Sequence, residues 1–213
     1  MKQKNVNRLL LGFVKLTGYL PAMLFFKPRV IYVDKSVQSK TLPKPCILVS
    51  NHQSLMDFVL YLCLFVRRTI RFQMAEVLFE KSKLFARFLF ALCGIYVNRN
   101  QQNMEMMATC IRILDRNGTI GVFPQGRLPV NGKPFPFKPG VIYLALQSNA
   151  PIVPIYTNGN YGLRKRATVV IGKPIYIKDW CKTQNPGEQE IKALTLQLQN
   201  EVMSMKEQVV SGD

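Results

Sequence analysis

The sequence predicts an α/β fold in which helices flank a mostly parallel central sheet. Short apolar runs bounded by proline or glycine alternate with longer segments of helical pattern, and this alternation is typical of parallel sheets. Hydrophobic residues make up 48% of the 213 residues, which excludes a globally disordered chain. A chain of this length buries a substantial core, and no linker or internal repeat divides it.

The expected strands are short apolar runs. The run CILVS ends at Ser50, and Pro43 and Pro45 bound it upstream. Similar runs recur along the chain. The expected strands are Cys46–Ser50, Thr69–Ala75, Ile95–Arg99, Thr119–Pro124, Pro151–Thr157 and two pieces of Ala167–Ile177 on either side of Gly172–Pro174.

The expected helices lie between and after these strands. Gly94 ends one of them, and Pro139 stands near the start of another, where its missing N–H is tolerated. The expected helices are Asp57–Phe65, Lys81–Gly94, Gln101–Asn117, Pro139–Asn149 and Asn185–Val209. Functional sites in such folds gather at the carboxyl ends of strands. His52 and the loop Pro124–Arg127 both follow expected strands directly.

The most apolar long stretch of the chain runs from Asn7 to Phe26. Lys15 interrupts it and Pro21 kinks or ends a helix, so it is marginal for a membrane span. A buried helix, an interfacial helix and a short anchor all remain open. Basic residues in or beside the stretch suit the anionic inner face of a membrane. They are Lys2, Lys4, Arg8, Lys15, Lys27 and Arg29. We expect peripheral or monotopic attachment to the cytoplasmic face of the cell membrane, with core packing as the competing interpretation.

The charge of the chain is strongly unbalanced. Its 29 Lys and Arg residues face 12 Asp and Glu residues, for a formal net charge of +17. Such a surplus attracts nucleic acid, anionic lipid, or an acidic carrier or substrate. No acidic residue lies between Asp115 and Asp179. The chain has no zinc finger, RNA-recognition signature or basic zipper helix, so we expect no nucleic-acid partner.

The five cysteines point to neither disulfides nor a metal site. They are Cys46, Cys63, Cys93, Cys110 and Cys181. Their number is odd, their spacing is wide, and no Cys-x-x-Cys motif occurs. One histidine cannot complete a zinc site with them. We expect reduced core residues in a protein that faces the cytosol.

His52, the only histidine, follows the first expected strand, and Asp57 stands five positions later. A histidine accepts a proton near neutral pH, and an aspartate bonded to its other ring nitrogen fixes its tautomer and orientation. No nucleophile-elbow motif is present, so the pair suggests activation of a substrate hydroxyl without a covalent enzyme intermediate. Taken alone, this spacing does not distinguish a catalytic histidine from a structural loop histidine.

Six blocks in order, from Cys46 to Ile175, resemble the glycerolipid acyltransferase family, which includes the lysophosphatidic acid (1-acyl-sn-glycerol-3-phosphate) acyltransferases. SNHQSLMD resembles the family's Asn-His-x4-Asp signature, GIYVNR its second block and VFPQGR its third. FKPGVIYLA resembles the helix start that follows, APIVPI the fourth block, and IGKPI a late strand and turn. The resemblance covers more than half of the chain. Together with the apolar amino-terminal stretch, it divides the chain into an expected membrane-associating helical segment over residues 1–30 and an expected acyltransferase domain over residues 31–213.

The resemblance also implies a role for each matching residue. His52 is the general base that deprotonates the acceptor hydroxyl, and Asp57 orients it. The implied substrate-binding residues are Asn51, Arg99, Gln125, Gly126, Arg127 and Lys138. Among these, the cations bind phosphate and backbone amides near Gly126 stabilise the oxyanion. An acyl thioester, carried by acyl-CoA or by acidic acyl carrier protein, is the co-substrate, and no further cofactor is implied.

The third block departs from the family pattern. Its usual glutamate is Gln125, and Arg127 stands where the family has threonine. The implied reaction of phospholipid biosynthesis acylates 1-acyl-sn-glycerol-3-phosphate to give phosphatidic acid. Because Gln125 is neutral and also donates hydrogen bonds, other acceptors stay open. These are another lysophospholipid, a lyso-aminolipid or a glycolipid hydroxyl, and a further alternative is a lipid-binding relative without catalytic activity.

Overall fold

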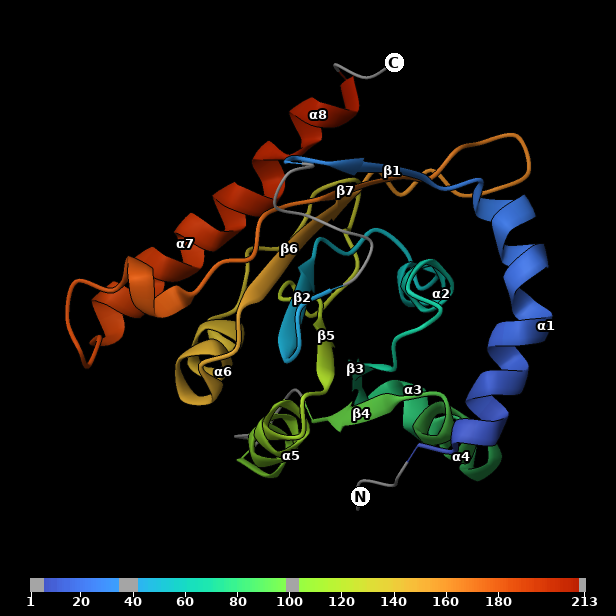
Figure 1. The fold of residues 1–213 in the computed structure, drawn as a ribbon, viewed down its shortest axis with the longest axis horizontal. Helices are drawn as coiled ribbons and strands as arrows, with labels where there is room; N and C mark the ends of the chain where they lie inside the picture. Colours follow the sequence, from blue (N-terminus) through green and yellow to red (C-terminus); the bar gives the residue numbers. More distant parts are fainter. Residues whose placement is uncertain (1–5, 35–41, 99–103, 211–213) are drawn as a thin grey trace.

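The computed structural model describes residues 6–34, 42–98 and 104–210. These residues form a seven-stranded sheet in the order β1-β7-β6-β2-β5-β3-β4 (Figure 1). All neighbouring pairs are parallel except β6 with β7. The strands are β1 (Arg29–Tyr32), β2 (Cys46–Ser50), β3 (Ile70–Ala75), β4 (Gly94–Val97), β5 (Thr119–Val122), β6 (Ile152–Thr157) and β7 (Thr168–Ile171). The predicted α/β class with a mostly parallel sheet is confirmed.

Helices cover both faces of the sheet, because each inner strand presents alternate side chains to opposite sides. In β2, Ile47 and Val49 join one apolar cluster, whereas Cys46 and Leu48 join the other. The first cluster includes side chains of α5, α6 and α7, and the second includes side chains of α1, α2 and α4. Figure 1 shows these two groups of helices on opposite sides of the sheet. The helices are α1 (Arg8–Phe26), α2 (Asp57–Leu64), α3 (Glu76–Glu80), α4 (Lys83–Ala91), α5 (Met104–Asp115), α6 (Gly140–Ser148), α7 (Glu188–Ser204), α8 (Lys206–Val210) and the 3-10 helix η1 (Ile177–Trp180).

The strands differ from expectation at several places. The edge strand β1 was not expected, and the run expected to end at Pro124 forms β5, which ends at Val122. The run expected to end at Arg99 forms β4, which ends at Val97, and Arg99 lies outside the described residues. The strand piece expected after Gly172–Pro174 is wrong, because Ile175 makes only an isolated bridge with Ile152. The chain turns into η1 directly afterwards. A proline at this point removes a ladder donor, so the strand does not resume.

Two expected helices differ in extent. The helix expected at Lys81–Gly94 is the shorter α4, whose preceding Ser82 accepts a hydrogen bond from the Phe85 amide and so sets its start. The helix expected at Asn185–Val209 is divided into α7 and α8 at Met205. Met205 is 4% exposed and packs in the core beneath the break. The apolar pattern continues across this break, so the sequence does not mark it.

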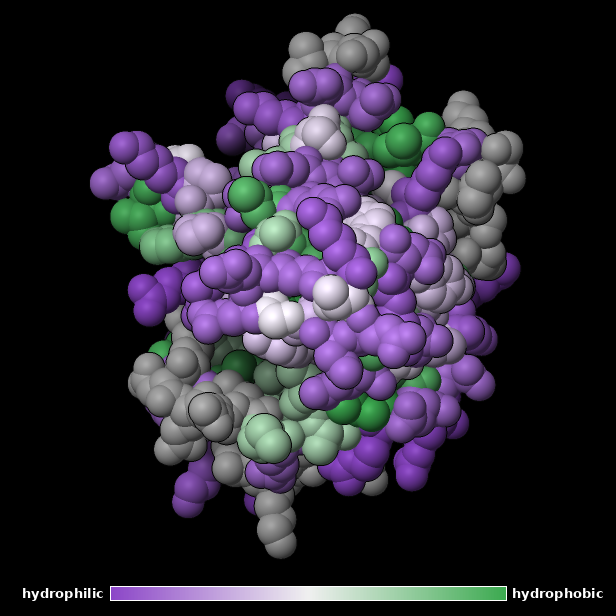
Figure 2. Space-filling view, turned by 90° about the vertical axis from the view of Figure 1, so that its left-hand side faces the viewer, coloured by the Kyte–Doolittle hydropathy of each residue, from purple (hydrophilic) through white to green (hydrophobic). Residues whose placement is uncertain are grey.

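Helix α1 is apolar on both sides, but only one side is packed. Leu11, Ala22 and Phe26 are buried where the helix lies against the domain. Its outer side chains are between 59% and 87% exposed, and they are Leu9, Phe13, Leu16, Leu20 and Leu24. By length and composition alone, the helix could also cross a membrane. By contrast, mostly hydrophilic side chains cover the side of the molecule on which α6 and α7 lie (Figure 2). Core packing therefore accounts for the inner face of α1 only.

The expected boundary between residues 30 and 31 falls inside β1. Helix α1 ends at Phe26. The backbone carbonyl of Phe26 accepts a hydrogen bond from the Ala167 amide at 2.8 Å. The helix thus leads directly into the edge strand of the sheet. The functional division into residues 1–30 and 31–213 stays a prediction.

Lys15 points into the protein, although the sequence placed it among the membrane-facing basic residues. It is 8% exposed, and its Nζ donates to the carbonyl oxygens of Val66, at 3.1 Å, and of Arg68. These carbonyls follow the end of α2, where backbone groups lack helical partners. Lys15 therefore ties α1 to the connection between α2 and β3.

Replacing Lys15 tests this assignment. Lys15→Met leaves the carbonyls of Val66 and Arg68 without their donor, so we expect the free energy of unfolding to fall by about 1–3 kcal/mol. Arg8→Met removes the same charge from an exposed position of the same helix and should change stability by less than about 0.5 kcal/mol. Urea denaturation followed by circular dichroism measures both. Equal effects of the two variants would contradict the inward role of Lys15.

Candidate active site

Three neighbouring strands bring their following loops to one edge of the sheet. β2 lies between β6 and β5, and the three run parallel, so their carboxyl ends meet. His52 follows β2, Gln125 follows β5, and Thr157 ends β6. The sequence identified the first two loops as candidates, and the structure adds the end of β6.

His52 and Asp57 form the pair that their spacing predicted. The Nδ1 atom of His52 lies 2.8 Å from Oδ2 of Asp57. Because an ionised carboxylate only accepts hydrogen bonds, the neutral imidazole carries its proton on Nδ1 and keeps a lone pair on Nε2. The histidine side chain is 16% exposed, whereas Asp57 is fully buried. The pair therefore presents a proton-accepting nitrogen on an imidazole whose other nitrogen is held.

The Asp57 carboxylate accepts hydrogen bonds from three further groups. The amides of Gln53, at 2.7 Å, and of Ser54, at 3.0 Å, donate to the same Oδ2 that bonds His52. The hydroxyl of Tyr161 donates to Oδ1. Asp57 is also the first residue of α2, where the helix dipole favours negative charge. These donors and the helix terminus together stabilise a buried charge.

Gln125 holds the main chain of the histidine loop. Its Oε1 accepts a hydrogen bond from the His52 amide at 2.6 Å, and the residue is 2% exposed. The ring of Phe123 stacks on the imidazole with 4.3 Å between centroids and 16° between planes. The loop after β5 thus contacts both the backbone amide and the imidazole ring of His52. Substrate contact, which the sequence suggested for Gln125, stays a prediction.

Asn51 joins the ends of β2 and β6. Its Nδ2 donates to the Thr157 carbonyl, and its Oδ1 accepts from the Thr157 amide, both at 2.8 Å. Asn51 is fully buried. In this geometry Asn51 orients the loop after β2. Substrate contact, which the resemblance implied for Asn51, stays a prediction.

Gly126 turns the loop after β5 with φ of +65°, a conformation that glycine adopts at little cost. Its amide donates to the Phe123 carbonyl at 2.9 Å, so this N–H is not free for an oxyanion. The amides on either side, of Gln125 and Arg127, bond no acceptor in the part of the chain that the structure describes. They stay the candidates for that role.

The predicted phosphate-binding cations have different surroundings. The Nζ of Lys138 lies 3.6 Å from the point where a Cβ at Gly126 would be, and the Lys138 amide donates to the Pro124 carbonyl at 3.0 Å. The Arg127 guanidinium lies over the ring of Phe135, at 5.8 Å. The structure therefore brings Lys138 to the loop that supports His52. The position of Arg99 lies outside the described residues.

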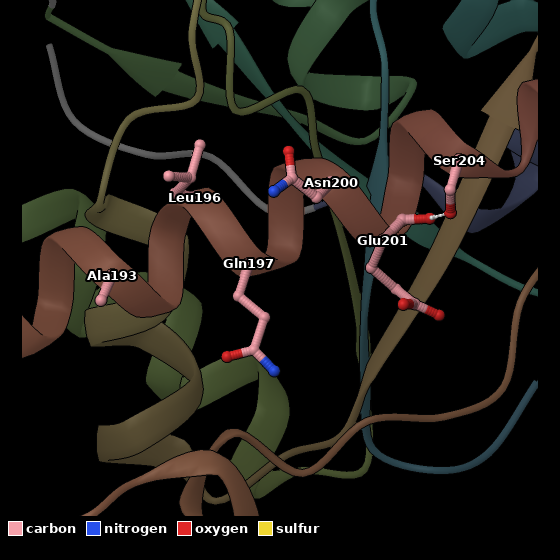
Figure 3. Close-up of a pocket in the computed structure, with 6 residues that line it drawn as sticks. All are labelled: Ala193, Leu196, Gln197, Asn200, Glu201 and Ser204. Carbon is pink, nitrogen blue, oxygen red and sulfur yellow. Dashed lines mark hydrogen bonds between the residues drawn. The ribbon is translucent and has the colours of Figure 1, made fainter.

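Two surface hollows are lined by other parts of the chain. One of about 440 Å³ is formed by a single face of α7, and its lining residues are Ala193, Leu196, Gln197, Asn200, Glu201 and Ser204 (Figure 3). The other, of about 770 Å³, lies between α6 and the residues around Lys178 to Pro186. In the first, Glu201 is the only ionisable side chain, and its carbonyl already accepts from Ser204. Neither hollow includes His52 or Asp57, so we do not take either as the active site.

The structure offers no evidence for a metal centre among the residues that it describes. No group of three His, Cys, Asp or Glu side chains there could hold an ion. Four of the five cysteines are buried and all five are free thiols. Burial raises the pKa of the Cys93 and Cys110 thiols to about 11, so both remain protonated at neutral pH. The predicted absence of a metal stays a prediction.

A histidine–aspartate pair that follows the carboxyl end of a parallel strand in an α/β domain lies where the functional sites of such domains gather. The chain belongs to the acyltransferase family, whose model, described as Acyltransferase, matches residues 32–158. The resemblance seen in the sequence is thereby confirmed.

Relatives agree with this assignment, and a solved structure has the same fold. Human 1-acyl-sn-glycerol-3-phosphate acyltransferase beta is 33% identical over 113 residues, which are 53% of this chain and 41% of the relative. The 1-acyl-sn-glycerol-3-phosphate acyltransferase of Cocos nucifera is 28% identical over 159 residues, 68% of this chain and 48% of the relative. The chain thus spans less than half the length of these relatives. The crystal structure of the 1-acyl-sn-glycerophosphate (LPA) acyltransferase PlsC from Thermotoga maritima has the same fold, with a TM-score of 0.60 and 21% identity over 93% of this chain and 79% of that one.

The buried Tyr61, near Asp57, makes the stability of the fold depend on pH. Burial raises the pKa of the Tyr61 hydroxyl well above its usual value, and the negative charge of Asp57 adds to this increase. An unfolded chain ionises tyrosine near pH ~10, so above that pH the folded state binds more protons than the unfolded state. Stability therefore falls as the pH rises past about 10, by up to about 1.4 kcal/mol per pH unit for this group.

Tyr61→Phe should make this alkaline decline shallower. Urea denaturation at a series of pH values from about 8 to about 11 gives the slope for each variant. Tyr19→Phe, which removes an exposed hydroxyl, serves as the control and should keep the wild-type slope. A Tyr61→Phe slope that matches the wild type would contradict the assignment, whatever the stability at neutral pH.

Proposed function

We propose that this chain is an O-acyltransferase that moves a fatty acyl group from an acyl thioester to the hydroxyl of a lysophospholipid. The observation that carries the proposal is the His52–Asp57 pair, in which a buried carboxylate holds Nδ1 and leaves Nε2 free. Membership of the acyltransferase family supports the reaction class. The names of the relatives support 1-acyl-sn-glycerol-3-phosphate as acceptor, with phosphatidic acid as product.

The chemistry follows from the protonation state of the imidazole. Nε2 of His52 takes the proton of the acceptor hydroxyl while the oxygen attacks the thioester carbonyl. Asp57 stabilises the imidazolium that forms, and free amides near Gly126 stabilise the oxyanion. The tetrahedral intermediate then collapses, the C–S bond breaks, and the imidazolium returns its proton to the leaving thiolate. The products are an ester and a free thiol.

Lys138 is the cation best placed to bind the phosphate of the acceptor. Its ammonium group lies against the Gly126 turn, next to the loop that holds His52. Arg127 and Arg99 extend this role in the proposal, since guanidinium groups bind phosphate through paired hydrogen bonds. The donor is acyl-CoA or acyl carrier protein, because a net charge of +17 suits both the phosphates of the first and the acidic surface of the second. We propose no further cofactor, metal or nucleic-acid partner.

We further propose that α1 docks on the cytoplasmic surface of the cell membrane without crossing it. Its outer face is apolar and exposed, while its inner face and Lys15 are held by the domain. At the end of α1, Lys27 donates to the carbonyl of Leu163, whose own side chain is 68% exposed. Arg164, Lys165 and Arg166 follow and are exposed. An apolar stripe bordered by cations fits an anionic lipid surface.

Replacing the general base tests the activity. We expect His52→Ala to fold and to lose acyl transfer by about 10²–10⁴-fold, because general-base help has that size. Mass spectrometry of the products should compare acyl-CoA and acyl carrier protein donors with a panel of acceptors, 1-acyl-sn-glycerol-3-phosphate first. Thr183→Ala, a change far from the pair in the sequence and on the exposed Lys182–Thr183 turn, is the control and should retain activity. Transfer to another acceptor only would reassign the substrate. Product formation by His52→Ala at the wild-type rate would overturn the mechanism.

Membrane docking is tested by a single charge on α1. Leu16 is 80% exposed on the outer face, so Leu16→Glu should leave the fold intact and weaken co-sedimentation with anionic vesicles by about tenfold or more. Leu196→Glu makes the same change at a position of α7 that is 56% exposed, and should bind vesicles as the wild type does. Equal loss in both variants would show a general charge effect, and no loss in either would remove α1 as the docking face.

A further inference from the structure

The hydroxyl of Tyr161 is the one side-chain donor besides His52 that reaches the Asp57 carboxylate within the described residues. We propose that Tyr161 is a positioning residue, which holds the carboxylate so that Oδ2 faces the imidazole. This inference rests on the proposed function, in which His52 is the general base. Tyr161 acts through Asp57 and does not itself touch the reacting atoms.

The two oxygens of Asp57 have separate tasks. Oδ2 receives His52 Nδ1 and the amides of Gln53 and Ser54, while Oδ1 receives the Tyr161 hydroxyl. The three donors on Oδ2 do not by themselves prevent the carboxylate from rotating. After a half-turn about the Cβ–Cγ bond, the same donors would bond Oδ1 instead. A separate donor on Oδ1, from another part of the chain, defines the plane of the group.

Tyr161 is itself held in place. Its ring meets the ring of Phe26 edge to face, with 5.2 Å between centroids and 89° between planes. Its oxygen lies 3.1 Å from the hydroxyl of Thr157, which donates to it because the tyrosine proton is used on Asp57. The loop around it is anchored where Asn158 Oδ1 accepts from the amides of Asn160 and Thr168. The donor is therefore preorganised before any substrate arrives.

The charge state of Tyr161 suits a permanent donor. Burial raises the pKa of the Tyr161 hydroxyl well above its usual range, and the negative charge of Asp57 adds to this increase. The hydroxyl therefore stays protonated at neutral pH. Besides His52 and Tyr161, the titratable group that acts on Asp57 is Tyr61 of α2, whose hydroxyl bonds Ser50 at 2.6 Å instead. Tyr61 therefore does not supply the missing donor when Tyr161 loses its hydroxyl.

Tyr161→Phe keeps the ring contact with Phe26 and removes only the donor. We expect kcat to fall by about tenfold while the KM of the acceptor stays within about twofold, because the base is misaligned and the binding groups are not. Tyr156→Phe is the matched control: it removes a buried tyrosine hydroxyl one position before Thr157, from the other apolar cluster, and should keep wild-type kinetics. Thr157→Val, which removes the second partner of Tyr161, should lower kcat in the same direction by a smaller factor.

The single histidine allows a readout that needs no activity. The 213-residue chain, labelled with ¹⁵N-histidine and free of any histidine tag, gives one set of imidazole resonances, all from His52. We expect the Nδ1 proton of wild type to resonate far downfield, and Tyr161→Phe to move it upfield and broaden it, since its bond to Asp57 is no longer fixed. Tyr156→Phe should leave it unchanged.

The two measurements separate the two proposals. If wild type transfers no acyl group, the proposed function fails, and the imidazole spectrum still decides whether Tyr161 positions Asp57. If wild type is active and Tyr161→Phe has the wild-type kcat and the wild-type Nδ1 proton resonance, the inference about Tyr161 is overturned. An equal loss in Tyr161→Phe and Tyr156→Phe, with an unchanged resonance, also overturns it, because it shows a packing effect alone.

Discussion

A carboxylate without access to water is the constraint on which the rest of the site depends. Asp57 is fully buried, and an unpaired charge at that depth would be strongly destabilising. Its donors come from His52 and the next two amides on one side, and from Tyr161 on the other. The strand-to-helix turn after β2 and the loop after β6 must therefore both be in place for the carboxylate to stay hydrogen-bonded and aligned. The same contacts that stabilise the charge also orient the imidazole.

The proposed membrane helix and the His52–Asp57 pair belong to one packed unit. Phe26, at the end of α1, contacts Tyr161 with its ring and accepts a backbone hydrogen bond from Ala167. Tyr161 in turn donates to Asp57. Further toward the start of α1, Lys15 donates to backbone carbonyls that follow α2. Asp57 is the first residue of α2. Seating α1 on a lipid surface would thus fix the direction in which the free imidazole nitrogen faces, without any separate hinge.

Local patterns in the sequence predicted the parts of the molecule that local patterns determine. Alternating apolar runs predicted most of the strands and helices, although not β1 or α3, and the close spacing of His52 and Asp57 predicted their pairing. Tyr161 lies 104 positions from Asp57, and nothing near it in the sequence signals a donor to a carboxylate. Lys15 was assigned to the membrane because its partners, beyond α2, lie 51 and 53 positions away. Such contacts are set by tertiary packing, which periodicity and composition do not encode.

Gln125, in the third block, directly supports the loop that carries His52. A backbone N–H requires only an acceptor oxygen, and the amide oxygen of Gln125 supplies one to His52 at 2.6 Å. Exchanging a carboxylate for an amide therefore keeps this support and removes a negative charge beside Gly126, against which the Lys138 ammonium lies. Without that carboxylate, the ammonium has no such partner on the loop and its charge is directed at an incoming anion. On this argument Gln125 is compatible with the proposed phosphate-bearing acceptor and with an intact general base, and the proposed phosphate binding falls to the cations around the loop.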